Sequence, residues 1–350
     1  MTTYLVTGAT GFVGHTLVRR LVRDGHTVRV VARPENPDLA IEAQCEVRVA
    51  SLGDPAALAE AASGTEVVFH CASESSSLAP AEAYAWINVA ATENVINAAR
   101  HAGVARLVHL SCTDTSLANR DRLSWRENQA LGEAPLDAMC RSKLLAEELA
   151  LNADDDELEV CVIKPAWVWG PGDRRTLPAL CREAARGGIR MCGNGDNLLP
   201  TVHVDNLVEA LLLAAAAERA AGRAYHVLDG EVLSAREFFG SLSKALGMRA
   251  PVPGFYALTY AGAWLRERLG RQGLVRADVV RRGRSALFDG AAAVHDLGYT
   301  PKVSVEQGMA GLSAWCQQQG GCAAIARMER KPSSHEDVAA LMRIATATAT

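Results

Sequence analysis

Short apolar runs rich in β-branched residues alternate with longer segments of helical periodicity through the first half of the chain. Runs with apolar residues on both faces are typical of strands buried inside a parallel sheet. The segments between them are long enough to form crossover helices, so the pattern predicts an α/β fold with a Rossmann-type, doubly wound parallel sheet. The six expected strands lie at 4–7, 27–31, 46–49, 66–71, 106–111 and 160–164.

The pattern changes after Gly170, where Gly and Pro gather and where helices and short strands then alternate without a clean repeat. We expect residues 1–170 to form the Rossmann domain, with later segments returning to it. Residues 171–316 are expected to form mainly a smaller α/β domain that binds the substrate. Residues 317–350 end in Ala and Thr repeats without a periodic apolar face, which predicts a loosely structured tail.

The longest apolar segment, residues 255–265, is followed directly by Arg266, Glu267 and Arg268. It has roughly half of the ~20 residues that a bilayer-crossing helix needs, so no membrane span is expected. The segment instead predicts an amphipathic helix that covers a pocket or forms a contact surface.

Composition narrows the choice of partners. The 350 residues include 36 basic and 40 acidic side chains, and this balance does not favour nucleic acid as a partner, because binding its phosphates requires clustered positive charge.

The nine cysteines form no C-x-x-C pair and no paired His spacing accompanies them, so we expect free thiols, no metal site and a reducing, cytoplasmic location. The amino terminus lacks the basic and apolar stretches of an export signal.

Three glycines follow the first expected strand and open the first expected helix. Gly8 permits a tight turn, Gly11 lets backbone amides approach a pyrophosphate, and Gly14 allows the helix to pack closely on the strand. The amino terminus of the helix offers unpaired N–H groups and a partial positive charge to phosphates. The motif therefore predicts that residues 1–170 bind a dinucleotide.

The end of the second strand indicates which dinucleotide is accepted. A carboxylate there would bind the 2′-hydroxyl of the adenosine ribose, whereas an arginine suits a 2′-phosphate. The stretch 30–34 contains Arg33 and no acid, and the planar guanidinium can meet a phosphate with two hydrogen bonds. We therefore favour NADP(H) over NAD(H); the alternative is a solvated arginine at the end of a strand.

Together with the glycine turn, several later motifs resemble the extended short-chain dehydrogenase/reductase family, also described as the NAD-dependent epimerase/dehydratase superfamily. Within this family the chain is most similar to the 3β-hydroxysteroid dehydrogenase branch, over about residues 3–316. The matching motifs lie at 8–14, 68–72, 87–92, 141–147, 164–173 and 202–206.

The resemblance implies a catalytic Tyr four residues before a Lys. The Tyr transfers a proton, the Lys holds the nicotinamide ribose and lowers the Tyr pKa, and a Ser after the fifth strand binds the substrate oxygen. Lys143 matches the Lys, but Met139 occupies the Tyr position, and its thioether neither donates nor accepts a proton at neutral pH. Cys112 occupies the Ser position, with Ser111 and Thr113 one residue to either side. Loss of a general acid is worth about 10² to 10⁴ in rate, so ordinary dehydrogenase chemistry is in doubt.

The resemblance also implies the remaining cofactor contacts and the assembly. After the third strand the family usually has an acidic residue for the adenine amine, whereas this chain has Ser51 and Leu52, of which the serine can still make one hydrogen bond. A homodimer is expected, formed through two long helices at 81–102 and 136–151. The residues expected to hold the dinucleotide are Gly8, Thr10, Gly11, Phe12, Val13, Gly14, Arg33, Ser51, Leu52, Cys71, Ala72, Asn88, Lys143, Pro165 and Val168.

The altered active site leaves three interpretations open. In the first, the protein is an oxidoreductase that keeps hydride transfer and takes its proton from water, from the substrate or from a neighbouring group. The neighbouring candidates are Cys112, Thr113, Asp114 and Asp137; Cys112 can equally be a small buried hydrophobe, and Asp114 a solvated loop carboxylate.

The second interpretation is a redox-neutral isomerase, dehydratase or cyclase that keeps the nucleotide as a structural element. Met139, Trp167 and Trp169 would then enclose the substrate, unless the tryptophans only pack between domains. The third is a nucleotide-sensing or scaffold protein without catalysis.

The substrate is expected to be an apolar small molecule, polycyclic or polyketide-like, that carries a ketone or a hydroxyl. Sugar-nucleotide enzymes of the same group usually place a basic residue near the segment that corresponds to 193–200, and this chain has none there. Glu74, Trp167 and Trp169 are the expected substrate contacts. His70 and His203 lie in apolar strand patterns and are interpreted as core histidines.

Overall fold

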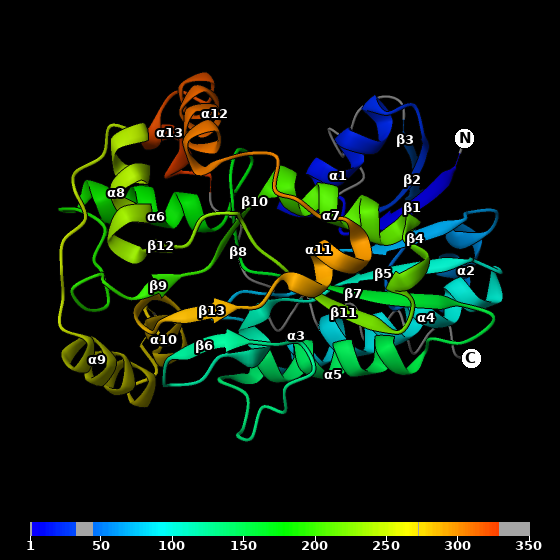
Figure 1. Cartoon of the computed structure of the whole chain (residues 1–350), viewed down its shortest axis with the longest axis horizontal. Helices are drawn as coiled ribbons and strands as arrows, with labels where there is room; N and C mark the ends of the chain where they lie inside the picture. The colour runs from blue at the N-terminus through cyan, green and yellow to red at the C-terminus, as the bar shows by residue number, and fades with distance from the viewer. Residues whose placement is uncertain (1, 33–44, 272, 329–350) are drawn as a thin grey trace.

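The structure, a computed structural model, describes residues 2–32, 45–271 and 273–328. At its centre is a seven-stranded sheet with the order β11-β7-β5-β4-β1-β2-β3, in which every neighbouring pair is parallel (Figure 1). Each end of the six predicted strands lies within one residue of the observed end, which confirms the predicted fold class. The strands are β1 (Thr3–Thr7), β2 (Thr27–Ala32), β3 (Cys45–Val49), β4 (Val67–His70), β5 (Arg106–Leu110), β7 (Glu159–Pro165) and β11 (Arg223–Val227).

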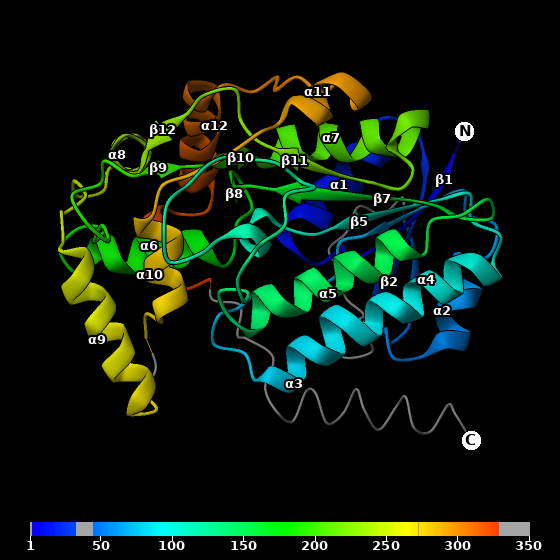
Figure 2. The same cartoon turned by 60° about the horizontal axis from the view of Figure 1, so that its bottom comes forward.

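Helices cover both faces of this sheet, and each helical layer buries one apolar cluster against the strands (Figure 2). The helices α1 (Phe12–Arg23), α7 (Val204–Ala216) and α11 (Ala291–Leu297) lie on one face. The helices α2 (Pro55–Ala62), α4 (Ala91–His101) and α5 (Ala138–Asn152) lie on the other. The short helix α3 (Ala81–Tyr84) and the π-helical turn η1 (Ala85–Ala90) lead into α4.

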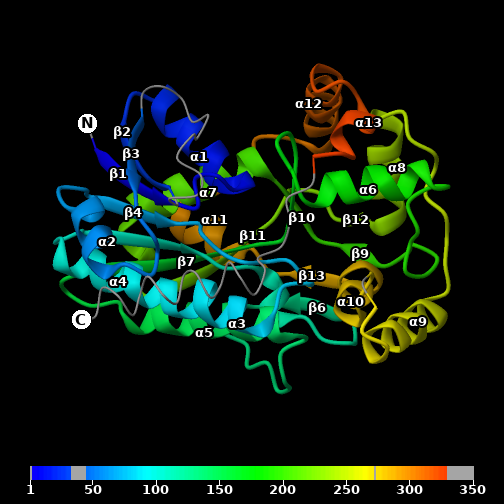
Figure 3. The same ribbon diagram turned by 180° about the vertical axis from the view of Figure 1, so that it is seen from behind.

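A second group of helices builds a smaller core beyond the carboxyl ends of the strands (Figure 3). It contains α6 (Thr176–Ala185), α8 (Ala235–Ala245), α12 (Val305–Gln318) and α13 (Cys322–Ile325). Capping boxes start α8 and α12, because Ser234 and Ser304 each accept a hydrogen bond from the third residue of their helix. The two-stranded pairs are β8 (Trp167–Trp169) with β10 (Thr201–His203), β9 (Leu198–Leu199) with β12 (Leu233–Ser234), and β6 (Arg122–Trp125) with β13 (Ala286–Phe288).

Two further helices pack against each other at this end of the molecule. They are α9 (Tyr256–Arg268) and α10 (Arg276–Gly283), and α9 confirms the helix predicted from the apolar segment 255–265. None of the helices in the described ranges is long and apolar enough to cross a bilayer.

The region expected to form a loose tail is partly ordered. Helix α12 continues to Gln318, and α13 follows after a turn with Ile325 fully buried in the smaller core. This corrects the prediction for residues 317–328: the short apolar motif of α13 gives no periodic signal, yet it packs on α6. Residues 329–350 lie outside the described residues.

Candidate active site

The glycine turn after β1 is closed by backbone packed against backbone. Gly8 has φ +73°, and a Cβ there would lie 2.5 Å from the Ala72 nitrogen, in the loop that follows β4. A Cβ on Gly14 would lie 2.3 Å from the Gly8 carbonyl oxygen. Both positions therefore exclude larger side chains, and the turn, Cys71 and Ala72 lie between β1 and β4, where ligands bind in sheets of this kind.

The amino terminus of α1 is open toward this turn. Gly11 caps the helix without a side chain, its N–H donates to the Gly8 carbonyl at 2.8 Å, and no acidic residue lies in the first turn. Thr10 is exposed, and the Phe12 ring lies beside Gly172 across the turn. Free N–H groups with no competing carboxylate fit a pyrophosphate, which the dipole of the helix would also favour.

The positions expected to contact the adenosine lie after β2 and β3. Arg33, on which the NADP(H) prediction depends, lies outside the described residues. Ser51 is buried, and its hydroxyl oxygen accepts a hydrogen bond from the Gly53 N–H at 3.1 Å. The Leu52 carbonyl accepts one from the Asn94 amide at 2.9 Å, which ties this turn to α4.

Asn88 lies in the π-helical turn η1 and uses its whole side-chain amide within the protein. The amide nitrogen donates to the Glu74 carbonyl at 2.9 Å and to the Ser142 hydroxyl at 2.8 Å, and the amide oxygen accepts from the Glu74 N–H at 2.8 Å. A π-helical turn often marks a functional site. In this structure Asn88 positions the loop after β4 against α5.

Lys143 reaches the carboxyl end of β5 from α5. Its ammonium is buried and donates to the Leu110 carbonyl at 2.6 Å, and burial lowers the pKa of Lys143 below its usual value. The charge is close enough to Cys112 and Cys71 to act on their ionisation. The bond to the Leu110 carbonyl is the one hydrogen bond that the Lys143 ammonium forms with the described residues. Its two other N–H groups therefore suit the hydroxyls of a ribose.

Met139 lies one helical turn before Lys143 and is buried against Tyr84 and Cys140. Asp137 caps the amino terminus of α5 by accepting from the Cys140 N–H at 2.7 Å, which fixes where the helix begins. Tyr84 donates its hydroxyl proton to the Ser76 carbonyl, and burial raises the pKa of Tyr84 to about 12. The hydroxyl of the tyrosine that packs with Met139 is thus engaged elsewhere.

Cys112 follows β5, and burial raises the pKa of its thiol to about 11. Thr113 is buried next to it. Asp114 and Asp137 both accept hydrogen bonds from Arg281 at 2.6 Å, so this arginine joins α10 to the site. Sequence reasoning missed Arg281, because it lies in an arginine-rich stretch that is typical of a solvated surface.

A buried ion pair lies behind the site. The Lys164 ammonium donates to Glu147 Oε1 at 2.7 Å, and the Ser111 hydroxyl donates to the other oxygen at 2.9 Å. Ser111, one of the alternatives for the substrate-binding serine, therefore faces Glu147 of α5. Sequence reasoning also missed this pair, since its partners lie on different elements.

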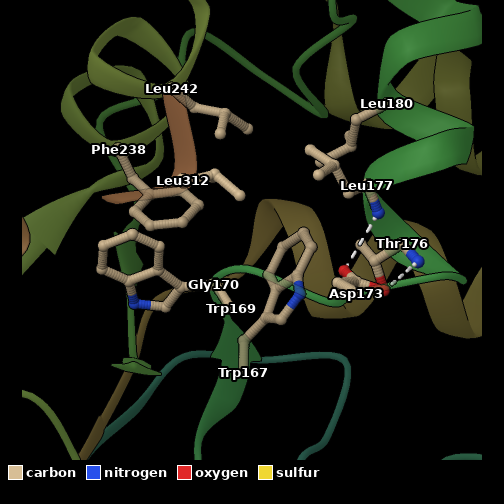
Figure 4. Close-up of a pocket in the computed structure, with 10 residues that line it drawn as sticks. All are labelled: Trp167, Trp169, Gly170, Asp173, Thr176, Leu177, Leu180, Phe238, Leu242 and Leu312. Carbon is tan, nitrogen blue, oxygen red and sulfur yellow. Dashed lines mark hydrogen bonds between the residues drawn. The ribbon is translucent and has the colours of Figure 1, made fainter. Parts of the chain in front are cut away.

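The side chains expected to contact the substrate lie in two places. Glu74 is buried and accepts from Arg175 at 2.9 Å in the loop after β4. The Trp169 indole donates to Asp229 at 2.8 Å, and Trp167 packs edge-on against Phe239. Figure 4 shows both tryptophans around a narrow cavity of the smaller domain, whose ≈ 20 Å³ has room for about one water.

Other predicted residues take core positions. Pro165 ends β7 and is buried, and Val168 of β8 packs on the sheet core. His70 lies between the hydroxyls of Thr7 and Thr92 at 2.7 and 3.0 Å, and burial lowers its pKa to about 3, which confirms it as a core histidine. His203 is buried too and caps α7 by accepting from the Asp205 N–H.

Comparison with known proteins places this geometry in a family. The model described as "NAD dependent epimerase/dehydratase family" matches residues 4–227. A 2-alkyl-3-oxoalkanoate reductase of Stenotrophomonas maltophilia (strain K279a) is 32% identical, with 89% of this chain and 98% of the relative covered. A 3-beta-hydroxysteroid dehydrogenase of Mycolicibacterium neoaurum is 29% identical, with 87% and 89% covered.

Among solved structures, MoeE5 in complex with UDP-glucose and NAD superposes with a TM-score of 0.72 at 26% identity, over 91% of this chain and 100% of that chain. The family model and the relatives together span the glycine turn, the loop after β4 and the helix that carries Lys143. This chain therefore belongs to the NAD dependent epimerase/dehydratase family, the extended short-chain dehydrogenases/reductases that its motifs predicted.

Proposed function

We propose that this protein is an NADP(H)-dependent oxidoreductase that interconverts a ketone and a hydroxyl on an apolar, polycyclic or polyketide-like small molecule. The observation that carries this proposal is the pairing of an open glycine turn with the buried Lys143 ammonium and the Cys112 thiol at the same edge of the sheet. The names of two relatives, a 2-alkyl-3-oxoalkanoate reductase and a 3-beta-hydroxysteroid dehydrogenase, support an apolar ketone or alcohol.

The dinucleotide, when bound, supplies or accepts the hydride. Lys143 would hold its ribose with the two N–H groups that the Leu110 carbonyl leaves free. Cys112 takes over proton delivery in the reductive direction, because its raised pKa keeps the thiol protonated at neutral pH. It donates its proton to the oxygen of the nascent alkoxide, the adjacent Lys143 ammonium stabilises the resulting thiolate, and water reprotonates the sulfur.

Asp114 and Asp137 have a different role in this scheme. Both carboxylates are held by Arg281 at 2.6 Å, so they serve to fix α10 against the mouth of the site. Met139 provides an apolar wall in place of the phenol that the family normally has there.

Absorbance at the nicotinamide band, followed with a panel of apolar ketones, tests this proposal. We expect Cys112→Ala to lower kcat by about 10²-fold or more and Cys112→Ser to retain activity, since a hydroxyl can replace the thiol as donor. Lys143→Met should weaken nucleotide binding, measured by fluorescence quenching, without lowering stability. Full activity of Cys112→Ala would rule out the thiol as proton donor.

The preference for NADP(H) depends on Arg33 in the sequence. We expect Arg33→Ser to reduce the ratio of NADPH to NADH affinity by at least tenfold, because it removes the guanidinium that would meet the 2′-phosphate. An unchanged ratio would contradict the assignment.

A redox-neutral isomerase, dehydratase or cyclase is the second candidate, because the buried Met139 thioether cannot supply the proton that accompanies the family's hydride transfer. Chromatography of the products would separate the two. Product formed in the presence of catalytic amounts of nucleotide, with no change in absorbance, would select the second candidate; nucleotide binding with no product would indicate a sensing protein.

We also propose a homodimer formed through α4 and α5, which lie side by side on one face and expose Leu145. A cytoplasmic location is proposed as well, supported by nine free cysteines. Sedimentation equilibrium of the protein and of Leu145→Glu tests the dimer, which the charged variant should dissociate.

A further inference from the structure

Helix α9 carries a stripe of large apolar side chains that nothing in the described structure covers. Phe255 is 76% exposed and Leu258 is 71% exposed, and Leu265 and Leu269 continue the stripe. Phe255 and Leu269 flank the helix, and Leu258 and Leu265 lie two turns apart with Gly262 between them, so the four side chains share one side of α9. Exposed apolar surface gathered in this way usually marks an interaction site.

The opposite side of α9 is packed, which shows that the stripe is not simply a poorly folded segment. Ala263 is fully buried, and Tyr256 and Tyr260 pack with it against Val279 of α10. Figures 1 and 2 show α9 at the outer end of the smaller domain, with α10 on its inner side. The stripe therefore faces solvent on a helix that is held in place.

Arginines border the stripe on both sides. Arg266 follows Leu265 and Arg268 precedes Leu269, so each lies about 100° around the helix from a stripe residue, in opposite directions. Arg271 follows three residues after the helix ends at Arg268. All three are exposed, and none forms a salt bridge within the described residues; Arg268 lies over the ring of Trp264 at 5.2 Å.

We infer that α9 docks this protein on an anionic lipid surface, with the stripe inserted among the acyl chains and the arginines beside the headgroups. An apolar face of Phe and Leu flanked by arginines, with Trp at its edge, is the pattern of helices that lie in the plane of a membrane interface. The cytoplasmic leaflet attracts such basic segments through its negative lipids.

A second copy of the chain fits the same surface less well. In a two-fold symmetric contact through α9, Arg266, Arg268 and Arg271 of the two copies would gather at one interface without acidic partners. The inner neighbour α10 carries Arg281, which contacts Asp114 and Asp137 at the candidate active site, so docking would bring the site close to lipid-dissolved molecules.

Co-sedimentation of the full-length protein with lipid vesicles tests this inference. We expect binding to vesicles of phosphatidylglycerol and phosphatidylcholine, and at least tenfold weaker binding to phosphatidylcholine alone. Leu258→Ser with Leu265→Ser should reduce the bound fraction at least tenfold, and Arg268→Gln with Arg271→Gln should remove the dependence on anionic lipid and on salt. Val294→Ser is the matched control, since Val294 is 55% exposed on the distant helix α11 and its loss should change nothing.

Vesicle binding requires no catalysis, so the result is separate from that of the activity assays. Failure of the wild type to sediment with anionic vesicles would overturn the inference, and so would unchanged binding of the α9 variants. A wild-type oligomer that Leu258→Ser dissociates, with no vesicle binding, would assign the stripe to contact between copies instead.

Discussion

Removing the Lys164 ammonium should destabilise the fold strongly, because it leaves a buried carboxylate without its counter-ion. The side chains of Lys164 and Glu147 are only 3% and 7% exposed, and their charged atoms lie 2.7 Å apart. In Lys164→Met the Ser111 hydroxyl, 2.9 Å from Glu147, is the one hydrogen-bond donor left to this carboxylate among the described residues, and the Lys143 ammonium still attracts it through space. Breaking a buried pair of this kind costs about 3–5 kcal/mol in the free energy of unfolding, whereas replacing both partners by apolar groups of similar volume is often close to neutral.

Urea unfolding followed by circular dichroism measures both effects. Lys164→Met should lose about 3–5 kcal/mol, and Lys164→Met with Glu147→Leu should regain most of this loss at an unchanged slope in denaturant. Arg236→Met provides the exposed control, since Arg236 and Asp196 are 58% and 66% exposed and such a pair contributes about 1 kcal/mol or less. Additive losses in the double variant, or a loss in Lys164→Met no larger than in Arg236→Met, would refute the argument.

Three other results are expected. Met139→Tyr should add the family's phenol as a second proton donor beside Cys112 and raise reductase turnover by about 10²-fold or more. The larger side chain should also overpack the site and destabilise the fold by about 1–3 kcal/mol. A folded, nucleotide-binding variant with no gain in the nicotinamide assay would contradict the assumed position of the phenol. Gly14→Ala should abolish nucleotide binding in a calorimetric titration, because the new Cβ would lie 2.3 Å from the Gly8 carbonyl oxygen. Gly25→Ala is the control: Gly25 has φ +83° and no atom within 4 Å of where a Cβ would lie, so the variant should lose only about 1–2 kcal/mol of stability and keep nucleotide binding. The free energy of unfolding should fall as the pH drops from about 6.5 toward 3. Burial lowers the pKa of His70 to about 3, so over this range the histidine takes up a proton in the unfolded chain but not in the folded one. In urea titrations between pH 7 and 5, His70→Gln should show a shallower fall, and an equal fall would assign the effect to other groups.

Most strands of the sheet could be predicted closely from sequence because their buried positions carry apolar residues on both faces, and β3 was predictable from its alternating Val47 and Val49. The exception is β11, Arg223–Val227, which lies at the edge beside β7 and begins with an exposed Arg, so it lacks that signal. The turn between Gly8 and Gly14 was also predictable, because its function depends on the absence of side chains.

Contacts between distant elements could not be predicted in this way. Arg281 joins Asp114 and Asp137 across more than 140 residues, and nothing in its local sequence distinguishes it from the solvated arginines beside it. The contact between Tyr84 and Met139 likewise arises only when α3 and α5 pack together. Local patterns determine which segments form strands and helices, whereas the ion pairs of a site depend on tertiary packing.

The buried ammonium of Lys143 bears on whether this site binds a ligand at all. Burial opposes its charge, which is why its pKa falls, and a single carbonyl acceptor compensates for only part of the lost hydration. In a protein that served only as a scaffold, a methionine at this position would pack equally well and avoid that cost. A ligand with hydroxyl groups would accept the remaining hydrogen bonds of the ammonium and so compensate for its lost hydration. The free protein then holds a poorly satisfied charge, and binding of the ligand satisfies it. The same reasoning applies to the open end of α1, whose N–H groups lack a capping side chain. Two under-satisfied groups that carry positive charge at one edge of the sheet therefore favour an anionic, hydroxyl-bearing ligand over an empty scaffold.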